Sequence, residues 1–322
     1  MRAITLTTDF GADDWFVGAM KAVILGIHPR ASVVDLTHGI APGDLRAGAF
    51  ALMAGCRYFP KGTVHVAVVD PGVGGPRRAI AARTANGFFV GPDNGVLSWA
   101  LRLEKIETIR LLENRDYFLD PVSRTFHGRD IFAPVAAHLS RGLPVRRLGR
   151  ELEDYVRLPW PQATKRPGQV RGEVVHLDRF GNAITNIQAE LLSGQTAGGC
   201  EISFGSRPVG HPVAERRAAR AEAAQASRPL PLASRPSVPA AGLRTPATTG
   251  PMAWRKARCP LAEFYGAVPL EHPVAVLGSS GLLEIAVNGG SAARSFGLRI
   301  GDRVTVRLAG LTAAPGVATL AP

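Results

Sequence analysis

The sequence has 322 residues, of which 46% are hydrophobic and 20% are charged, a balance typical of globular proteins. This length exceeds what one ordinary hydrophobic core supports, so the sequence predicts two domains. No apolar run approaches the roughly 18 residues that a membrane-spanning helix needs, which argues against a membrane partner. The three cysteines are scattered and the first residues show no secretory pattern. We therefore expect a cytoplasmic protein without a disulfide framework or zinc site.

The formal net charge of +12 belongs mainly to one segment. Residues 206–258 contain ten Lys or Arg and two Asp or Glu, and they therefore carry +8 of the total. A diffuse basic tract binds polyanions only weakly, so we expect no specific nucleic-acid partner and keep a nucleic-acid role only as an alternative. The segment is rich in Ala, Pro, Arg and Ser and lacks periodicity, which predicts a disordered insertion without chemistry at about 206–258.

Strand and helix signals alternate over the first 160 residues. Short β-branched and apolar runs bounded by turn residues predict strands at 3–8, 32–36, 64–69, 79–84 and 87–90. Apolar residues at helical spacing predict a helix that Asp13 or Asp14 caps and that runs to Ile27. They also predict helices from Asp44 to Cys56, after Gly95, and from Thr125 to Gly142. This order predicts an α/β domain over residues 1–160 with a largely parallel sheet flanked by helices.

The pattern changes after a proline-spaced connector that ends at Gly168. From there the sequence shows short alternating segments separated by turns. They predict strands at 170–177, 182–187, 274–277, 282–287 and 303–308. We therefore expect an all-β, barrel-like domain over residues 168–322.

Polar residues follow the predicted strand that ends at Val69. Asp70 stands at its carboxyl end, and a glycine-rich turn then leads to Arg77. Ligands of open α/β sheets bind at this edge, and glycine lets backbone N–H groups approach them closely. His127 opens a later helix, where a neutral imidazole can take a proton and an arginine can stabilise a nascent hydroxide. These three residues are the candidate catalytic set. Taken alone, the turn with its arginine is also explained as a solvated turn, and His127 as a helix-capping residue.

Other polar residues also lie where predicted strands meet turns. Asp9 ends the first strand, where it can accept hydrogen bonds from a ribose diol or cap a helix. In the second domain, hydroxyl, amide and carboxyl groups occupy two further turns that are also explained as ordinary hairpins. These residues are Asp178, Asn182, Ser279, Ser280 and Asn288.

Seven motifs occur in a fixed order along the chain. They are Thr-Thr-Asp-Phe-Gly at 7–11, Val-Asp-Pro-Gly-Val-Gly at 69–74, Pro-Asp-Asn-Gly at 92–95, Phe-His-Gly-Arg-Asp-Ile-Phe at 126–132, Asp-Arg-Phe-Gly-Asn at 178–182, Gly-Ser-Ser-Gly at 278–281 and Glu-Ile-Ala-Val-Asn at 284–288. Together they resemble the S-adenosyl-L-methionine (SAM) hydroxide adenosyltransferase family, the SAM hydrolases, which are related to the SAM-dependent fluorinase and chlorinase. The resemblance covers nearly the whole chain outside about 206–258.

The resemblance implies an N-terminal α/β domain, a C-terminal β-barrel domain and a homotrimer. Its active site would lie between the N-terminal domain of one subunit and the C-terminal domain of the next. The implied reaction is hydrolysis of SAM to adenosine and L-methionine, with SAM as the substrate and no cofactor or metal. A sulfonium leaves as a neutral thioether, so the reaction needs in-line positioning and one base rather than a general acid.

The resemblance also implies roles for individual residues. Asp70, Arg77 and His127 would activate water, and Asp9 would bind the ribose. The remaining residues would hold the methionine end (Asp178, Ser279), lie nearer the nucleoside (Asn182, Asn288) or flank the adenine (Tyr265, favoured over Phe264). Ser280 beside Ser279 is also expected to bind substrate.

The sequence departs from the family pattern at two places. Gly128 replaces a halide-contacting serine of the fluorinase pattern, which favours water over halide. The insertion replaces the barrel strand expected before Phe264, which puts the completeness of the second domain in doubt. A SAM-dependent halogenase and a non-catalytic SAM- or adenosine-binding module are therefore kept as alternatives.

Overall fold

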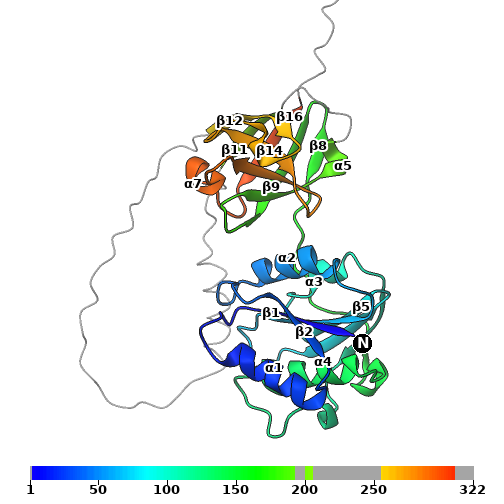
Figure 1. Ribbon diagram of the computed structural model, residues 1–322. Coiled ribbons are helices and arrows are strands. Elements are labelled where there is room, and N and C mark those ends of the chain that lie inside the picture. The colour runs from blue at the N-terminus through cyan, green and yellow to red at the C-terminus, as the bar shows by residue number, and fades with distance from the viewer. Residues whose placement is uncertain (1, 193–199, 206–254, 309–322) are drawn as a thin grey trace, which may run out of the picture. The chain divides into compact units, whose positions relative to one another are not determined.

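The computed structural model describes residues 2–192, 200–205 and 255–308 (Figure 1). The chain divides into two compact units, Met1–Trp160 and Pro161–Pro322. Most of the predicted insertion, residues 206–254, lies outside the described residues. No helix among the described residues has the length and apolarity needed to cross a membrane.

The first unit contains a seven-stranded mixed sheet with the order β2-β1-β3-β5-β4-β6-β7. The pairings of β1 with β2, β1 with β3 and β3 with β5 are parallel, whereas β4 with β5, β4 with β6 and β6 with β7 are antiparallel. The prediction of a largely parallel sheet is therefore only partly confirmed, because the Asn86-Gly87 turn makes β4 and β5 a hairpin. The strands are β1 (Ala3–Thr8), β2 (Ser32–Thr37), β3 (Thr63–Val68), β4 (Ala79–Thr84), β5 (Gly87–Pro92), β6 (Ile106–Leu111) and β7 (Glu151–Leu152).

Helices cover both faces of this sheet. Figure 1 shows α2 (Leu45–Cys56) and α3 (Ser98–Leu101) on one face, and α1 (Phe16–Ile27) and α4 (Ala133–Ser140) on the other. Apolar residues of β1, β3 and β5 pack against α1 and α4 to form a buried core. Such burial of apolar surface is the main stabilising term of the fold.

The starts of three helices of this unit can be compared with the sequence-based predictions. The helix predicted from Asp44 to Cys56 is present as Leu45–Cys56, and Asp44 is its N-cap, because its side chain accepts a hydrogen bond of 2.9 Å from the Ala47 N–H. Trp15 occupies the N-cap of α1 without a side-chain hydrogen bond, so the prediction of Asp13 or Asp14 as its cap is wrong. The helix predicted from Thr125 begins instead as a π-helical turn, Gly128–Phe132, which leads directly into α4.

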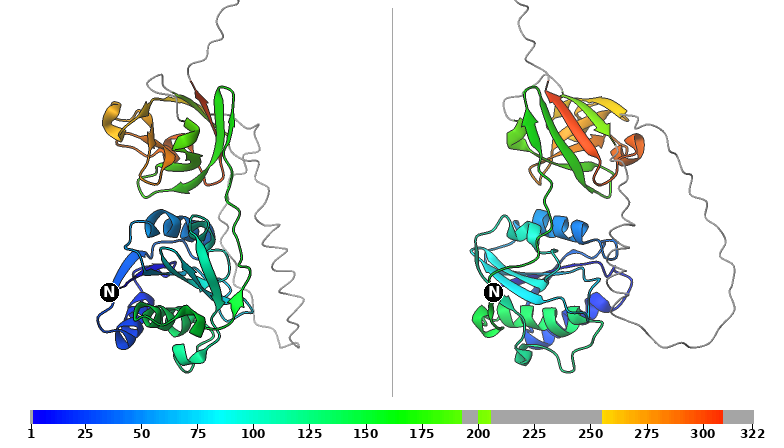
Figure 2. Two further views of the ribbon diagram at one scale, coloured as in Figure 1. Left: turned by 90° about the vertical axis from the view of Figure 1, so that its right-hand side faces the viewer. Right: turned by 180° about the vertical axis from the view of Figure 1, so that it is seen from behind.

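The described residues of the second unit form a curled sheet of nine strands (Figures 1 and 2). Its order is β12-β11-β16-β9-β10-β15-β14-β13, and β8 also pairs with β9. All pairings are antiparallel except that of β13 with β14. The strands are β8 (Thr164–Arg166), β9 (Gln169–Leu177), β10 (Ala183–Gln188), β11 (Cys200–Gly205), β12 (Arg255–Cys259), β13 (Leu261–Ala262), β14 (Pro273–Leu277), β15 (Leu282–Val287) and β16 (Arg303–Leu308).

Two features of this unit differ from the sequence-based expectation. Short helices α5 (Ala189–Leu192) and α7 (Ala292–Phe296) accompany the strands, so the unit is not purely β. The strand expected before Phe264 is present as β12, which pairs with β11 along its whole length. The prediction that the insertion replaces this strand is therefore wrong, because backbone pairing overrides a composition rich in Arg.

Candidate active site

The candidate catalytic residues lie in the loops of the first unit that adjoin two strands and a helical turn. Asp70 follows β3, Arg77 precedes β4, and His127 directly precedes the π-helical turn. The parallel pairing of β1, β2 and β3 brings their carboxyl ends to one edge of the sheet, where ligands of such sheets bind. Asp130 in the π-helical turn anchors the segment before His127, because its buried carboxylate accepts a hydrogen bond of 2.8 Å from the Ser123 N–H.

The structure brings Asp70, Arg77 and His127 into direct contact. Arg77 Nε donates to Asp70 Oδ1 at 3.1 Å and to Oδ2 at 2.9 Å, and Arg77 Nη2 donates to Asp70 Oδ2 at 2.5 Å. The same Nη2 lies 2.7 Å from His127 Nδ1. The side chains of Asp70 and Arg77 are only 4% and 12% exposed, so solvent screens their ion pair weakly. The arginine therefore joins the carboxylate to the imidazole.

This geometry fixes the protonation of the histidine. A guanidinium nitrogen can only donate, so Nδ1 of His127 accepts and the neutral ring carries its proton on Nε2. Burial, and then the nearby Arg77 cation, lower the pKa of His127 below its ordinary value, whereas Asp70, Asp130 and the Ser123 backbone oppose this shift. The lone pair of the neutral ring is thus already engaged by Arg77, and His127 is poorly placed to take a proton from water.

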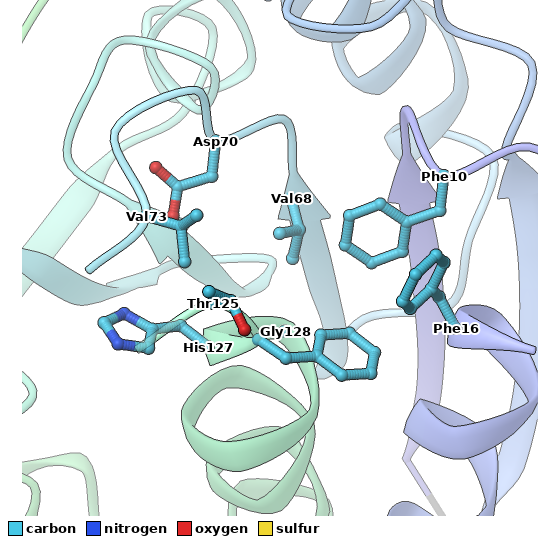
Figure 3. A pocket seen from close by; sticks show the side chains of 9 residues that line it. Phe10, Phe16, Val68, Asp70, Val73, Thr125, His127 and Gly128 are labelled. Carbon is cyan, nitrogen blue, oxygen red and sulfur yellow. The ribbon is translucent and has the colours of Figure 1, made fainter. Parts of the chain in front are cut away.

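A cavity of about 140 Å³ lies beside this group, several times the volume of one water molecule. Figure 3 shows Asp70, Val73 and His127 on one side of it and Phe10 and Phe16 on the other. The sequence indicated the polar members but missed the aromatic walls, because apolar residues at helical spacing are interpreted as core. The lining residues are Phe10, Phe16, Val68, Asp70, Val73, Thr125, Phe126, His127 and Gly128.

Gly128 lies where the cavity wall is tightly packed. A Cβ atom at this position would lie 3.3 Å from Met20 Sδ and from two ring carbons of Phe10. Such contacts are closer than ordinary van der Waals separation, so a larger side chain requires its neighbours to move. The missing side chain therefore lets the Phe10 ring pack closely at this part of the cavity wall.

Asp9 lies at the same sheet edge but does not line the cavity. Its Oδ2 accepts a hydrogen bond of 2.7 Å from the Gly43 N–H, which joins the turn after β1 to the loop after β2. Asp9 does not cap α1, because the N-cap residue is Trp15. An ionised carboxylate can accept about four hydrogen bonds, so Asp9 keeps capacity for the hydroxyls of a diol.

The candidate residues of the second unit form a cluster around two carboxylates. Asn182 donates to Asp178 through its backbone N–H at 2.8 Å and through Nδ2 at 2.9 Å. Tyr265 donates its hydroxyl to Glu284 Oε2 at 2.6 Å. Burial, and next the Glu284 hydrogen bond, raise the pKa of Tyr265, and the charge of Asp178 acts in the same direction.

The sequence did not assign a role to Glu284, although this residue is central to the cluster. Its side chain lies in the buried strand β15 and is only 6% exposed. Burial raises the pKa of Glu284, and the charge of Asp178 adds to this shift, whereas the Tyr265 hydrogen bond opposes it. A glutamate between apolar residues in Leu-Leu-Glu-Ile-Ala-Val was the signal that could have identified it.

The remaining predicted residues have separate environments. Asn288 donates from Nδ2 to the Val268 carbonyl at 2.7 Å and so supports the turn that carries Tyr265. Ser279 is exposed, whereas the Oγ of Ser280 is buried and has no hydrogen-bond partner among the described residues. A buried hydroxyl without a partner is costly unless a ligand or water satisfies it. Among the described residues, no group of three or more His, Cys, Asp or Glu side chains is arranged to hold a metal ion.

Family models match both units of the chain. The model of the SAM hydroxide adenosyltransferase N-terminal domain matches residues 4–149. The model of the corresponding C-terminal domain matches residues 172–215 and 240–305. One family model therefore matches the α/β unit of this chain, and the other matches its β-rich unit.

Curated relatives agree with these matches. The chain is 38% identical over 310 residues to (R)-S-adenosyl-L-methionine hydrolase of Thermus thermophilus, covering 94% of this chain and 98% of the relative. It is 45% identical over 192 residues to the protein of that name from Salinispora tropica, covering 59% and 73%. A fluorinase from Actinopolyspora mzabensis is 29% identical over 222 residues, covering 61% and 74%.

The fold is shared with a conserved protein of Thermotoga maritima described as uncharacterized, at a TM-score of 0.76 and 33% identity, covering 95% of this chain and 99% of that one. A conserved hypothetical protein of Thermus thermophilus gives a TM-score of 0.65 at 37% identity, covering 95% and 100%. The chain therefore belongs to the SAM hydroxide adenosyltransferase family.

Proposed function

We propose that this protein hydrolyses SAM to adenosine and L-methionine by attack of water on C5′ of the ribose. The observation that carries the proposal is the contact of Asp70, Arg77 and His127 beside a cavity, in a chain of this family. Its similarity to proteins named (R)-S-adenosyl-L-methionine hydrolase supports the same reaction and extends the proposal to the (R) sulfonium epimer.

The reaction balances without an external reactant other than water. The C5′–S bond breaks and its electron pair moves to sulfur, which leaves as the neutral thioether of methionine. The C5′–O bond forms from water, and the proton that water loses passes to a base and then to solvent. Positive charge on the sulfonium disappears, so the site must mainly align water, C5′ and sulfur. The proposed chemistry requires no metal or cofactor.

We assign the base to Asp70 rather than to His127. Water that bonds to C5′ becomes strongly acidic, so a carboxylate is basic enough to remove its proton at that stage. Asp70 lines the cavity and keeps lone pairs beyond those that accept from Arg77. His127 acts as a positioning residue, because its Nδ1 holds the Arg77 guanidinium that orients the carboxylate.

Substrate-binding roles follow the polar groups of each unit. Asp9 would accept hydrogen bonds from the ribose diol, and Asp178 would pair with the α-ammonium group of the methionine end. Ser279 and the buried hydroxyl of Ser280, which has no partner among the described residues, would bind the carboxylate of the methionine end. Tyr265 would flank the adenine, because Glu284 holds its ring while Phe264 lies 60% exposed. Asn182 and Asn288 would support the nucleoside side of the pocket.

Assembly and location are also proposals. We propose a homotrimer in which the second unit of one subunit completes the site on the first unit of its neighbour. Exposed apolar residues on the turns of the second unit, namely Phe180, Phe264 and Leu270, support such a contact. We also propose that the curled sheet closes as a barrel, and that the protein acts in the cytoplasm on SAM, without specific nucleic-acid or membrane partners. Light scattering of the purified protein measures its molar mass, which should be three times that of one chain.

The reaction is tested by incubating the purified protein with a mixture of the two sulfonium epimers of SAM. We expect equimolar adenosine and methionine to appear and only the (R) epimer to disappear. Adenosine binding without turnover at ample protein concentration would favour a non-catalytic binding module. Formation of 5′-chloro- or 5′-fluoro-5′-deoxyadenosine in the presence of halide would favour the halogenase alternative.

A further inference from the structure

A second histidine stands at the sheet edge that carries the candidate site. His38 follows β2, and its Nδ1 lies 2.8 Å from the hydroxyl of Thr8, the last residue of β1. Its Nε2 lies 3.0 Å from Asp35 Oδ1. Asp35 in turn pairs with Lys21 of α1 at 2.6 Å. A polar chain therefore runs from α1 through β2 to the end of β1.

Hydrogen bonds to Thr8 and to His38 hold the turn after β1 at both of its ends. The Phe10 N–H donates to the Thr8 hydroxyl at 3.2 Å. The Gly11 N–H donates to the backbone carbonyl of His38 at 2.9 Å. Asp9 and Phe10 lie between these two attachments, so the side chain and backbone of His38 together fix the turn that presents both residues.

The hydrogen-bond capacities of the groups allow the Thr8–His38 bond in either direction. The Thr8 hydroxyl accepts from the Phe10 N–H and still has one hydrogen and one lone pair for Nδ1 of His38. The other ring nitrogen, Nε2, faces the Asp35 carboxylate. Thr8 is completely buried and the side chain of His38 is 11% exposed, so water competes little with these bonds.

We infer that His38 is a positioning residue for substrate binding, acting through Thr8 on the turn that carries Asp9 and Phe10. The inference rests on the proposed function, because Asp9 is assigned there to the ribose. Phe10 lines the cavity and Asp9 is tied to Gly43, so a loosened turn would displace a wall of the cavity and the ribose contact together. His38 itself does not line the cavity.

The chain offers a matched control in the same sheet. His65 of β3 makes the same type of contact, because its Nδ1 lies 2.8 Å from the hydroxyl of Thr5 in β1. This pair is buried in the middle of the strands and holds no turn of the site. Loss of the Thr5–His65 bond should therefore affect folding stability without affecting the ligand.

The experiment compares His38→Leu, His38→Asn and His65→Leu by adenosine titration calorimetry, SAM kinetics and thermal unfolding. An asparagine amide can replace Nδ1 as the hydrogen-bond partner of Thr8, as acceptor or as donor, whereas leucine cannot. For His38→Leu we expect the adenosine Kd and the KM for SAM to rise about tenfold, as for one lost buried hydrogen bond, with kcat little changed. His38→Asn should restore most of the affinity, and His65→Leu should change Tm but not Kd or KM.

Two results would overturn the inference. One is a folded His38→Leu protein with the adenosine Kd and KM of the wild type. The other is a His38→Asn protein as impaired as His38→Leu. If His38→Leu fails to fold, Thr8→Val removes the same bond with little change in volume, and an unchanged Kd in that variant refutes the inference equally. A wild-type protein that neither binds adenosine nor cleaves SAM would instead refute the proposed function.

Discussion

Arg77 Nη2 contacts both Asp70 Oδ2, at 2.5 Å, and His127 Nδ1, at 2.7 Å. One nitrogen thus connects the proposed base to the imidazole, and the centroid of the Phe132 ring lies 5.5 Å from the guanidinium carbon as a further support. A planar fork of donors can satisfy all of these contacts together, whereas an ammonium group cannot.

Arg77→Lys is therefore expected to behave almost as a loss of function. Lysine keeps the charge but cannot hold the carboxylate and the imidazole in one geometry, so kcat should fall by about 10²-fold or more, and Arg77→Ala at least as far. Arg83→Lys is the matched control, since Arg83 forms an exposed ion pair of 2.7 Å with Glu107. Steady-state kinetics of the three variants checks this. An Arg77→Lys enzyme as active as Arg83→Lys would remove the proposed role.

His127 variants distinguish a positioning histidine from a base. An asparagine oxygen at this position can still accept from Arg77, whereas alanine leaves the guanidinium nitrogen without that partner. We expect His127→Ala to lower kcat by about 10²-fold and His127→Asn to retain activity within about tenfold of the wild type. Steady-state kinetics checks both variants. Equal inactivity of the two variants, with both folded, would contradict a role limited to holding Arg77.

The pH dependence of kcat follows from the lowered pKa of His127. Above that pKa the ring is neutral and Nδ1 accepts from Arg77. As the pH falls through it, Nδ1 gains a proton and the contact becomes a repulsion between two cations. We expect a constant kcat from neutral pH upward and a decline only below the ordinary histidine value of about 6.5. A pH–rate profile that already declines between about pH 8 and 7 would contradict this assignment.

Gly128 should tolerate no larger side chain without adjustment of its neighbours. Gly128→Ser places an atom 3.3 Å from Phe10 and Met20, so we expect a lower Tm and a higher KM for SAM. We also expect no halogenated adenosine when chloride or fluoride is added, because Phe10 and Met20 crowd a serine at this position. Product analysis checks this, and a halogenated nucleoside from Gly128→Ser would show that the site accepts halide after this single change.

The sequence predicted the parts of the molecule that depend on local pattern. The strand before Asp70, the helix that ends at Cys56 and the convergence of polar turns all follow from short-range signals and from the shared edge of parallel strands. Strand β6 was missed because charged residues such as Glu107 and Arg110 interrupt its apolar pattern. Strand β12 was missed because its composition is basic, although it pairs fully with β11.

The finer features of the site depend on contacts between distant residues. The orientation of Tyr265 is set by Glu284, which lies on a strand 19 residues further along the chain. The proton position on His127 is set by Arg77, 50 residues earlier. No periodicity or motif encodes either relationship, because each arises from tertiary packing.

The central claim is that water activated beside Asp70 attacks C5′ of SAM. Its most direct test is turnover in ¹⁸O-labelled water, followed by mass spectrometry of both products. We expect one ¹⁸O atom in the 5′-hydroxyl of adenosine and none in methionine, and we expect Asp70→Asn to lower the rate of this labelling by about 10²-fold or more. Adenosine without the label, or labelling at an unchanged rate in Asp70→Asn, would contradict the proposed mechanism.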